Sequence, residues 1–586
     1  MCGIFCCFSK SSEPHSCLEN DLLRSLQKRG PDAQSVLNIN TVSATFAGFV
    51  LWHQGVYLCK QPMESSEYVL LFNGDIFNLE ALTDASGISD TEWLFHKLSK
   101  CSTDGEILNC FRLIEGPYCL IFYDKLEGNI YFARDSLGRN SLLIENTKDH
   151  LRILSTSRSN DENKNTTVEL PPLGIFKINI KNFDKSTVFP WHHIDDYWKS
   201  QANILESVCG IKLFVEQAVE PYWFSQQSSL EKYTFNFYSF DAQELSAVQL
   251  YDHLLKDKEI LEALREFSSL LENSVKQRVQ LTTKVCAKCS ILPCNHSKVA
   301  ILFSGGIDCT ILALLADKFV DKADSIDLIN VSFQQANSEL ENWNVPDRES
   351  ARQSLTDLKA LCPNRTWNFI EANVTRKTLY TNLKENIKHL IYPLNTVLDE
   401  SIGCAFWFAS QGYGLLDGSP FESNAKVVIV GSGADELFGG YIRHKNAYKR
   451  CNGTHEDKEK CLYEELEMDW QRIPTRNLAR DDRVIADSGR TPRSPFVEEN
   501  VVKFARSLKP RQRCCFLYDD GVGDKLFLRL YGYKAGLTTP TFLKKRAIQF
   551  GSKIANKKEN AKDRSLYLNI KPFDKNNHMV WPSHHV

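Results

Sequence analysis

Residues 299–308 read VAILFSGGID, and this stretch decides the fold of the C-terminal half of the chain. Val299–Phe303 is a short apolar strand, a glycine turn follows, and an apolar helix is expected over Thr310–Phe319. A second strand is expected at Leu328–Phe333, and the run Val427–Val430 again meets a glycine-rich turn and a helix. Strand, glycine turn and helix in succession are typical of a parallel α/β sheet that binds a nucleotide at its strand ends.

The turn Ser304-Gly305-Gly306-Ile307-Asp308 has the composition of an anion-binding loop. Its two glycines let the backbone fold tightly and present N–H groups, ahead of a helix N-terminus, to a pyrophosphate. Ser304 can donate a hydroxyl hydrogen bond, whereas Asp308 needs a magnesium ion between its carboxylate and a phosphate. The loop is not a Walker A loop, because no Gly-Lys-Ser/Thr ends it. The alternative is a glycine-rich turn without a ligand.

This loop resembles the PP-loop of ATP pyrophosphatases. A second stretch, GSGADELFGGY at 431–441, resembles the signature of asparagine synthetases and the related β-lactam synthetases. The resemblance implies ATP and Mg²⁺, with the metal at Asp308 and Asp435. The ATP- and pyrophosphate-binding residues that it implies are Leu302, Ser304, Gly305, Gly306, Asp308, Val331, Gly431 and Asp435.

The N-terminus begins Met1-Cys2-Gly3-Ile4-Phe5. A small residue after the initiator usually lets Met1 be removed, which leaves Cys2 with both a thiol and a free α-amine. The amine titrates near pH ~8 and the thiol near ~8.5, so the amine can act as base for its own thiol. The start of the chain therefore predicts an N-terminal nucleophile.

Three further motifs accompany Cys2: Arg29-Gly30-Pro31-Asp32, Asn73-Gly74-Asp75 and Ser89-Asp90-Thr91-Glu92. Asn-Gly after a strand is by default a hairpin turn. Its functional interpretation is an oxyanion hole, because an Asn side-chain amide and a following Gly N–H can point to one oxygen. Asp90 can bind an α-ammonium group.

Together these motifs, with Arg134-Asp135-Ser136-Leu137-Gly138, resemble the class II glutamine amidotransferase domain. The resemblance implies the αββα sandwich of N-terminal nucleophile hydrolases and glutamine hydrolysis through a thioester, which releases ammonia. It also implies catalytic roles for Cys2, Asn73 and Gly74, and glutamine binding by Asn73, Gly74, Asp75 and Asp90.

The sequence departs from the amidotransferase pattern at Val50. This residue stands at the approximate position of the arginine that pairs with the α-carboxylate of glutamine, and no arginine occurs between Arg29 and Arg112. A bidentate arginine–carboxylate contact at a desolvated site contributes on the order of a few kcal/mol. The point charge of Lys60 does not reproduce that fork.

Two departures also affect the synthetase half. Ser432 replaces the family glutamate that assists attack on the adenylate, and serine is not a general base at neutral pH without help. The pyrophosphate lysine of the family falls near Ala547, although Lys544, Lys545 and Arg546 precede it.

Four potential metal ligands, Cys286, Cys289, Cys294 and His296, stand just before the nucleotide-binding strand. Cys-x-x-Cys followed by Cys and His can supply the three thiolates and one imidazole of a structural Zn²⁺ site. The spacing matches no standard zinc finger, so the alternative is a loop with ordinary free thiols.

Composition excludes several classes of protein. The net charge of -3 gives no basic field for nucleic acid, and the absence of an 18-residue apolar run argues against a membrane span. The N-terminus lacks a signal region, so we expect a cytoplasmic protein whose 19 cysteines are reduced.

A chain of 586 residues is too long for a single core. We expect an amidotransferase-like domain at 2–185, a linker or insertion at 186–257, an ATP-binding domain at 258–560 and a tail at 561–586. Strands are expected at Val69–Phe72, Tyr118–Tyr123 and Asn129–Ala133, and an amphipathic helix over 258–280.

The order of the two halves resembles glutamine-dependent asparagine synthetases, and among them the divergent proteins that carry an asparagine synthetase domain. The resemblance implies glutamine, aspartate and ATP as substrates and asparagine biosynthesis as the activity. Two alternatives remain: a non-catalytic ATP-binding or regulatory protein of the same fold, and an amidoligase with another carboxylate acceptor.

Overall fold

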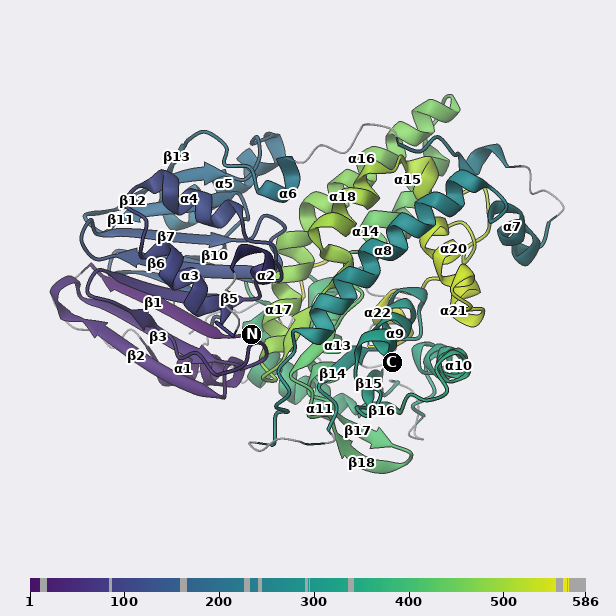
Figure 1. Cartoon of the computed structure of the whole chain (residues 1–586), viewed down its shortest axis with the longest axis horizontal. Coiled ribbons are helices and arrows are strands. Elements are labelled where there is room, and N and C mark those ends of the chain that lie inside the picture. Colours follow the sequence, from purple (N-terminus) through teal and green to yellow (C-terminus); the bar gives the residue numbers. More distant parts are fainter. Residues whose placement is uncertain are drawn as a thin grey trace, which may run out of the picture.

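The chain forms two lobes in the computed structural model (Figure 1). The structure describes residues 1–10, 18–83, 87–158, 166–225, 232–240, 245–289, 294, 296–335, 342–554, 562–565 and 568. The predicted tail therefore lies outside the described residues, apart from 562–565 and 568. One lobe contains two stacked sheets and the other surrounds a third sheet.

Two sheets lie face to face in the N-terminal lobe. The first has the order β10 (Thr167–Glu169), β8 (Leu143–Asn146), β9 (His150–Leu154), β1 (Gly3–Ser9), β3 (Ala44–Val50) and β2 (Ala33–Ile39). The second has the order β13 (Lys212–Val215), β12 (Asn182–Pro190), β11 (Gly174–Asn179), β7 (Asn129–Arg134), β6 (Tyr118–Asp124), β5 (Tyr68–Gly74) and β4 (Met63–Glu64). Neighbouring strands are antiparallel, except for the parallel pair β12 and β13.

Helices cover the outer faces of both sheets. Alternating side chains such as Ile4, Phe46 and Phe132 face inward and form the core between the sheets. Helix α1 (Asn20–Arg29) packs on the first sheet, and α3 (Asp90–Leu98) and α4 (Asp104–Arg112) pack on the second. The layers are helix, sheet, sheet and helix, so the predicted αββα sandwich is confirmed.

Asn73 and Gly74 do not form the hairpin turn that an Asn-Gly pair typically predicts. Both residues are the last two of strand β5 and pair with Cys119 and Tyr118 of β6. A Cβ atom on Gly74 would lie 2.3 Å from the carbonyl oxygen of Pro117, so the neighbouring backbone leaves no room for a side chain. The strand therefore continues through the motif and brings Asn73 to the edge of the lobe interface.

The third sheet is parallel through five strands, with the order β16 (Trp367–Val374), β15 (Ile326–Phe333), β14 (Val299–Leu302), β19 (Val427–Ile429) and β20 (Thr491–Arg493). The hairpin β17 (Tyr413–Leu416) and β18 (Ser419–Glu422) extends it antiparallel beyond β16. Strand order reverses between β14 and β19, and a ligand binds at such a reversal, outside the carboxyl ends of the strands. The predicted parallel α/β half is confirmed.

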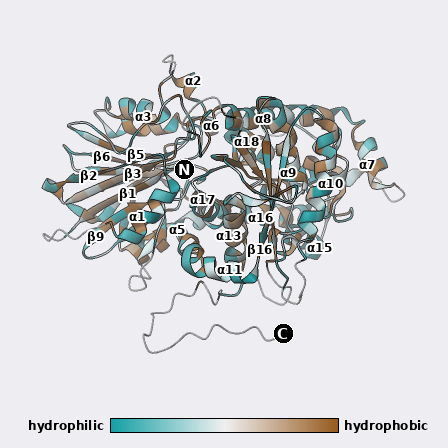
Figure 2. Ribbon diagram, turned by 90° about the horizontal axis from the view of Figure 1, so that it is seen from below, coloured by the Kyte–Doolittle hydropathy of each residue, from teal (hydrophilic) through white to brown (hydrophobic). Residues whose placement is uncertain are grey.

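Helices pack on both faces of this sheet. Helices α8 (Lys258–Gln280), α9 (Ile307–Phe319) and α20 (Leu526–Lys534) contribute to the core on one face, and α13 (Val397–Ser410) contributes to the core on the other. The helix predicted over 258–280 is α8, with the same bounds. Figure 2 shows the brown, hydrophobic residues along the strands and teal residues on the outer turns of the helices.

The region from 186 to 257 contributes to both lobes. Strand β12 extends to Pro190, and α5 (Asp196–Cys209) leads to β13, the edge strand of the second sheet. Farther along, Phe235 and Phe237 lie in the core of the C-terminal lobe, and the ring of Phe235 stacks on that of Phe527. Phe235, Phe237 and Tyr251 are thus core residues, whereas Phe214, Tyr222 and Phe224 of the same region are exposed.

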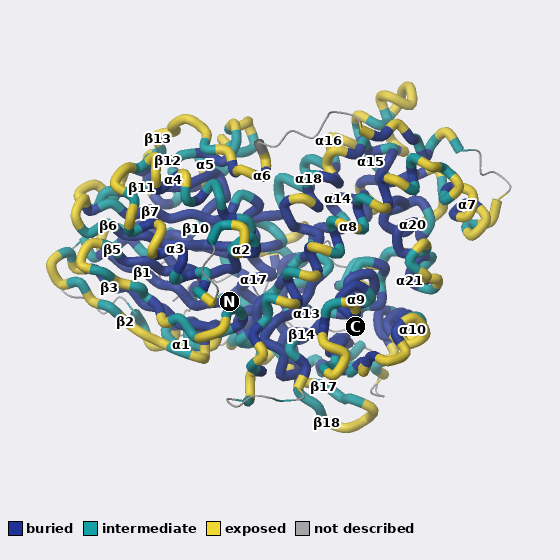
Figure 3. Tube along the Cα trace, in the orientation of Figure 1, coloured by how far each residue is buried: buried dark blue, intermediate teal, exposed yellow. Residues whose placement is uncertain are grey.

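The N-terminus and helix α17 (Ala479–Ala486) lie at the boundary between the lobes (Figures 1 and 3). All eight residues of α17 are buried, including its charged residues Arg480, Asp481, Asp482 and Arg483. Buried charges are costly unless they are paired, so the charged side chains of a helix that lies between the lobes need partners from the surrounding protein. This helix joins the two candidate sites described below.

The expectation that every cysteine is reduced is not met at one place. Cys451 and Cys461 are joined as a disulfide, which closes the segment between α15 (Ile442–Arg450) and α16 (His455–Ile473). The other described cysteines form no disulfide. Cys451 directly follows α15, and Cys461 lies about two turns into α16. The turn between the two helices brings their Sγ atoms together.

Candidate functional site

Cys2 and Asn73 lie together at the lobe boundary, although 71 residues separate them in the sequence. The backbone nitrogen of Cys2 donates a hydrogen bond of 2.7 Å to Oδ1 of Asn73. Removal of Met1 turns that nitrogen into the α-amine, so Asn73 is placed to orient the base that the nucleophile requires. The side-chain amide of Asn73 donates to Sγ of Cys119 at 3.5 Å, and an oxyanion role requires it to leave that partner.

Met1 covers Cys2, the predicted nucleophile, while it remains attached. Met1 is 1% exposed and Cys2 is 5% exposed. Burial lowers the pKa of the Met1 amine to about 5 and raises the pKa of the Cys2 thiol above its ordinary value. A buried neutral thiol is a weak nucleophile, so activation requires that Met1 be removed.

Asp90 remains available for a substrate ammonium group. It is the first residue of α3 and accepts a 2.7 Å hydrogen bond from the N–H of Thr91. Burial and the nearby carboxylate of Asp75 raise its pKa to about 7. A bound ammonium group offsets both effects and favours the ionised carboxylate.

Asp75, by contrast, is held by other protein groups. Its carboxylate accepts from Nη2 of Arg493 at 2.8 Å and lies 2.9 Å from Nε2 of His53. Burial alone would raise its pKa, but Arg493 and His53 outweigh burial and hold the pKa well below its ordinary value. Because Arg493 belongs to β20, Asp75 connects the lobes, and glutamine binding by it stays a prediction.

Val50 is an apolar wall residue at the end of β3. It is buried in the same core cluster as Cys2 and pairs with Ala33 of β2. No charge that could bind a carboxylate lies at this position. The arginine contact that the amidotransferase resemblance implies is therefore absent at this position.

The second candidate site is a cavity of about 560 Å³ at the strand-order reversal of the third sheet. Its size is that of a small-molecule site. Of the residues predicted to bind ATP, seven line it: Leu302, Ser304, Gly306, Asp308, Val331, Gly431 and Asp435. Gly305 instead shapes the loop: its φ is +78°, and a Cβ atom there would lie 2.3 Å from the backbone nitrogen of Ala351.

Lys525 joins the two predicted magnesium ligands. Its buried ammonium lies 2.7 Å from Oδ2 of Asp308 and 3.0 Å from Oδ1 of Asp435. Lys545 lies 2.5 Å from the other oxygen of Asp435 and lines the cavity. Burial alone would raise the pKa of Asp435, but Lys525 and Lys545 hold it below its ordinary value.

The acidic pair fits the magnesium ion that the resemblance implies. Asp308 and Asp435 both line the nucleotide cavity, and Oδ1 of Asp435 lies 3.0 Å from the ammonium of Lys525. Hard oxygen ligands of this kind suit Mg²⁺, which usually takes one or two carboxylates and completes its shell with phosphate and water. Lys545 supplies a cation where the sequence has Ala547 in place of the family lysine, although Ala547 also lines the cavity.

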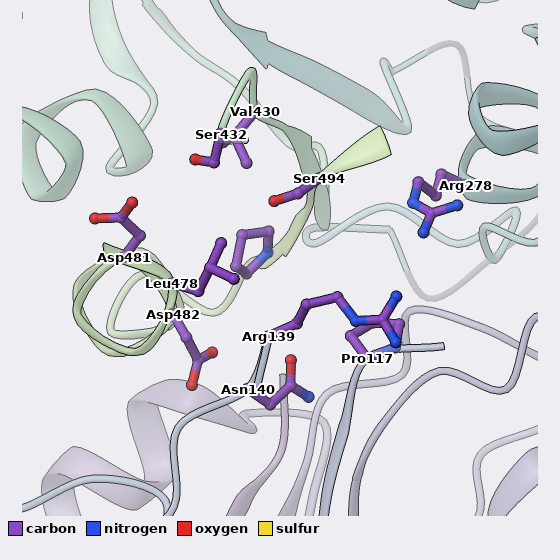
Figure 4. Close-up of a pocket in the computed structure, with 11 residues that line it drawn as sticks. Pro117, Arg139, Asn140, Arg278, Val430, Ser432, Leu478, Asp481, Asp482 and Ser494 are labelled. Carbon is purple, nitrogen blue, oxygen red and sulfur yellow. The ribbon is translucent and has the colours of Figure 1, made fainter. Parts of the chain in front are cut away.

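A second, smaller cavity of about 20 Å³ lies between the lobes (Figure 4). Pro117, Arg139 and Asn140 line it from the N-terminal lobe, and Arg278, Val430, Ser432, Leu478, Asp481, Asp482, Pro492 and Ser494 line it from the C-terminal lobe. A volume of 10–15 Å³ or more on this measure holds one water molecule, and ammonia is of similar size. The cavity is therefore large enough for one such molecule.

The small cavity shares lining residues with the nucleotide cavity, and one of its other lining residues is hydrogen-bonded to the Cys2 site. Val430, Ser432 and Asp481 line it and the nucleotide cavity as well. On the opposite side, Asn140 donates a 2.8 Å hydrogen bond to the carbonyl oxygen of Asn73. A chain of contacts thus leads from the Cys2 site through this cavity to the nucleotide site.

Sequence reasoning missed Lys525, Asn140 and Asp481. Lys525 has φ of +53°, just before α20, and no motif marks it. Asp481 is buried beside Arg480, whose Nε and Nη2 both donate to Oδ1 of Asp481 and whose Nη1 donates to Asp399. The tertiary fold alone brings Asn140 and Asp481 to the cavities and Lys525 to the carboxylates of Asp308 and Asp435, which line the nucleotide cavity.

The four predicted zinc ligands also come together, in the segment between α8 and β14.

Among the described residues, no helix is both long enough and apolar enough to cross a membrane. The structure thus contains an N-terminal thiol site, a nucleotide-sized cavity, a connecting cavity and a separate cysteine–histidine cluster.

Comparisons with known proteins divide the chain in the same order. The glutamine amidotransferase domain family matches residues 1–195, and the asparagine synthase family matches residues 295–456. An asparagine synthetase domain-containing protein of Drosophila melanogaster is 46% identical over 96% of this chain and 100% of its own length. Asparagine synthetase domain-containing protein 1 of Homo sapiens is 34% identical over 97% of this chain and 98% of its own length. Asparagine synthetase B, glutamine-hydrolysing, of Escherichia coli is 23% identical over 88% of this chain and 76% of its own length.

Proposed function

This chain belongs to the family of asparagine synthetase domain-containing proteins, and we propose on that basis that it makes asparagine from aspartate, ATP and glutamine. Glutamine is hydrolysed at Cys2, and the ammonia attacks an adenylated aspartate at the nucleotide cavity. The products are glutamate, asparagine, AMP and pyrophosphate. We assign the amidotransferase role to the N-terminal lobe and the adenylation role to residues 258–560, and we place the protein in the cytoplasm.

One observation carries the proposal: the cavity between the lobes is lined by Ser432 and Asp481, which also line the nucleotide cavity. Its opposite wall includes Asn140, which is hydrogen-bonded to Asn73 beside Cys2. A water-sized cavity that shares residues with the nucleotide cavity, and whose lining residue Asn140 is hydrogen-bonded to Asn73, supports passage of ammonia between the two sites.

At the first site, the α-amine of Cys2 takes the thiol proton and Sγ attacks the side-chain carbonyl carbon of glutamine. The carbon–nitrogen bond then breaks, the amine returns the proton and ammonia leaves. Water hydrolyses the thioester to glutamate. Asn73 orients the amine through its Oδ1, Gly74 provides a backbone N–H for the oxyanion, and Asp90 binds the substrate ammonium.

At the second site, a side-chain oxygen of aspartate attacks the α-phosphorus of ATP and pyrophosphate leaves. The Ser304–Gly306 turn and the N-terminus of α9 receive the phosphates. Asp308 and Asp435 hold Mg²⁺, which when bound neutralises phosphate charge. Lys525 and Lys545 keep the carboxylate of Asp435 ionised and add positive charge at the leaving pyrophosphate.

Asp481 takes the proton that is lost when ammonia attacks the adenylate. Ser432 stands where the family has a glutamate, and Asp481 shares both cavities with it. Oδ1 of Asp481 accepts from Arg480, which leaves Oδ2 without a partner among the described residues. Burial raises the pKa of Asp481 to about 6, so it is ionised at neutral pH and weakly basic.

A second candidate function is a non-catalytic ATP-binding protein of the same fold. The apolar Val50 near Cys2 favours it, because no charge there binds the α-carboxylate of glutamine. An amidoligase with another carboxylate acceptor is the third candidate. In both alternatives the nucleotide cavity and Asp435 keep their roles.

Two assays on the purified chain separate these functions. Glutamate release from glutamine is compared between the wild type and Cys2→Ala, and pyrophosphate release from ATP is measured with aspartate, with and without ammonium. We expect Cys2-dependent glutamate release and aspartate-dependent pyrophosphate release. Equal glutamate release by both chains rejects hydrolysis at Cys2, and pyrophosphate release that ignores aspartate rejects this acceptor.

A further inference from the structure

Three thiols and one imidazole converge in the segment that leads from α8 to β14. One ligand atom from each of Cys286, Cys289, Cys294 and His296 lies within 4.8 Å of the others. We propose that these four residues bind one zinc ion, at a site separate from both the Cys2 site and the nucleotide cavity. The set is complete with four protein ligands, as in structural zinc sites.

The distances between the ligand atoms suit a tetrahedron around one ion. Nδ1 of His296 lies 3.5 Å from Sγ of Cys286 and 3.3 Å from Sγ of Cys289. With Zn–S bonds of about 2.3 Å and Zn–N bonds of about 2.0–2.1 Å, the edges of a tetrahedron measure roughly 3.4 to 3.8 Å. The side chains therefore need only small adjustments to coordinate an ion at their centre.

The local backbone supports metal binding. The N–H of Cys289 donates to Sγ of Cys286 at 3.2 Å, within the Cys-x-x-Cys turn. Hydrogen bonds from the surroundings to the ligating atoms stabilise a metal site and tune its affinity. Lys298 donates to the carbonyl oxygens of Cys294 and His296, at 3.0 and 2.6 Å, and so fixes the second pair of ligands.

The donor set selects the metal. Three thiolates and an imidazole are soft and borderline ligands that bind zinc well, whereas Mg²⁺ and Ca²⁺ require oxygen. No carboxylate belongs to the cluster within the described residues. Three thiolates around Zn²⁺ leave one negative charge, and the ammonium of Lys298 lies close enough to offset it.

The site lies where it can hold the lobes together. Thr283, three residues before Cys286, donates its N–H to the carbonyl oxygen of His53 in the N-terminal lobe at 2.8 Å. Ala287 donates to the carbonyl oxygen of Asn424, and Lys288 pairs with Glu422 of the β17–β18 hairpin. Zinc at this position fixes the segment between these contacts and the first strand of the nucleotide site, so its role is structural.

Metal analysis of the full-length chain tests the proposal. The protein is purified with a reducing agent, its affinity tag is removed, and zinc and iron per chain are measured by mass spectrometry. We expect one zinc per chain in the wild type and in the control Cys110→Ser, whose cysteine lies in α4. In Cys289→Ser and His296→Ala we expect zinc content and Tm to fall together.

Reconstitution tests the same site without a variant. Chelator-treated wild-type protein is titrated with Co²⁺, for which we expect one equivalent to bind with the absorption bands of tetrahedral thiolate coordination, and then with Zn²⁺, which displaces it. A wild type that is purified without zinc and binds neither metal stoichiometrically overturns the proposal. Iron with inorganic sulfide in place of zinc also overturns it, as does a zinc content that both ligand variants retain.

Discussion

Arg29 and Asp482 form a fully buried ion pair between the lobes, with Nη2 of Arg29 lying 3.2 Å from Oδ2 of Asp482. Nε of the same arginine donates to the carbonyl oxygen of Cys2 at 3.3 Å. Asp482 also accepts from the N–H of Ser141, and its neighbour on α17, Asp481, lines both cavities. Arg29 therefore connects the backbone of Cys2, the predicted nucleophile, to helix α17. The same helix carries Asp481, which lines the nucleotide cavity.

Asp482→Ala removes this pair and leaves Arg29 buried without its carboxylate. Breaking a buried ion pair by removing one partner costs about 3–5 kcal/mol, so we expect a decrease of that size in the free energy of unfolding. Urea denaturation measures it. Lys199→Ala is the control, because its pair with Asp196 lies on the surface, and it should leave the unfolding free energy unchanged. A small effect of Asp482→Ala would contradict the role of this pair.

Cys2→Ala should lower glutamine hydrolysis by at least about a thousandfold, because the covalent step then has no nucleophile. Pyrophosphate release driven by added ammonium should stay at the wild-type rate, since the nucleotide site is intact. Cys110→Ser, in α4, is the matched cysteine control. Protein mass should show that Met1 is absent from the active wild type, and glutamine hydrolysis by a chain that keeps Met1 would refute the role of the free amine.

Asp481→Asn should lower ammonium-dependent asparagine formation by about 10²–10⁴-fold, the usual contribution of a general base. Only the ionised carboxylate accepts a proton, and burial raises its pKa to about 6. In the wild type, the activity should therefore be present above pH 6 and be lost as the pH falls through 6, and the variant should lack this step.

Pyrophosphate–ATP exchange serves as the internal reference for Asp481, because burial also raises the pKa values of Asp347 and Glu436 in the same cavity to about 7. Titration of those two groups changes exchange and asparagine formation together, whereas Asp481 changes only the second. Asp487→Asn is the matched control for Asp481→Asn, because it also replaces a buried carboxylate at α17. Equal losses of both activities in Asp481→Asn would make its role structural.

Lys525→Met should lower aspartate-dependent pyrophosphate release by about a hundredfold, the scale of one lost electrostatic contact at a reacting centre. The variant removes the ammonium that lies within 3.0 Å of both Asp308 and Asp435, so the pKa of Asp435 should rise. Initial rates across a magnesium titration measure the effect. Lys534→Met, at the exposed end of α20, should match the wild type, and so would Lys525→Met if the lysine were not part of the site.

The fold could be predicted from the sequence wherever one local pattern was sufficient. The strand, turn and helix of VAILFSGGID predicted the parallel sheet, and the apolar stripe of 258–280 predicted α8 with its bounds. The default prediction of a turn at Asn73-Gly74 was wrong. A dipeptide typical of turns continues as a strand here because the neighbouring strand β6 pairs with it.

The sites were predictable only where a motif is contiguous. Cys2, Asn73 and Asp435 belong to motifs, and the structure places each beside a cavity or a partner that suits its predicted role. Lys525 and Asp481 belong to none. Lys525 matters because of Asp308 and Asp435, which are distant in the sequence, and Asp481 matters because the fold brings it to both cavities. Asp75 shows the converse: a motif residue whose carboxylate is held by Arg493, which lies 418 residues away.

Transfer of a labelled amide nitrogen tests the central claim most directly. Wild-type protein is incubated with ATP, magnesium, aspartate and glutamine labelled with ¹⁵N at the side-chain amide, in the presence of excess unlabelled ammonium. The account predicts that asparagine carries the label in excess of the ammonium pool, that one AMP forms for each asparagine, and that Cys2→Ala makes only unlabelled asparagine. Wild-type protein with a free N-terminal cysteine that forms neither asparagine nor AMP would contradict it.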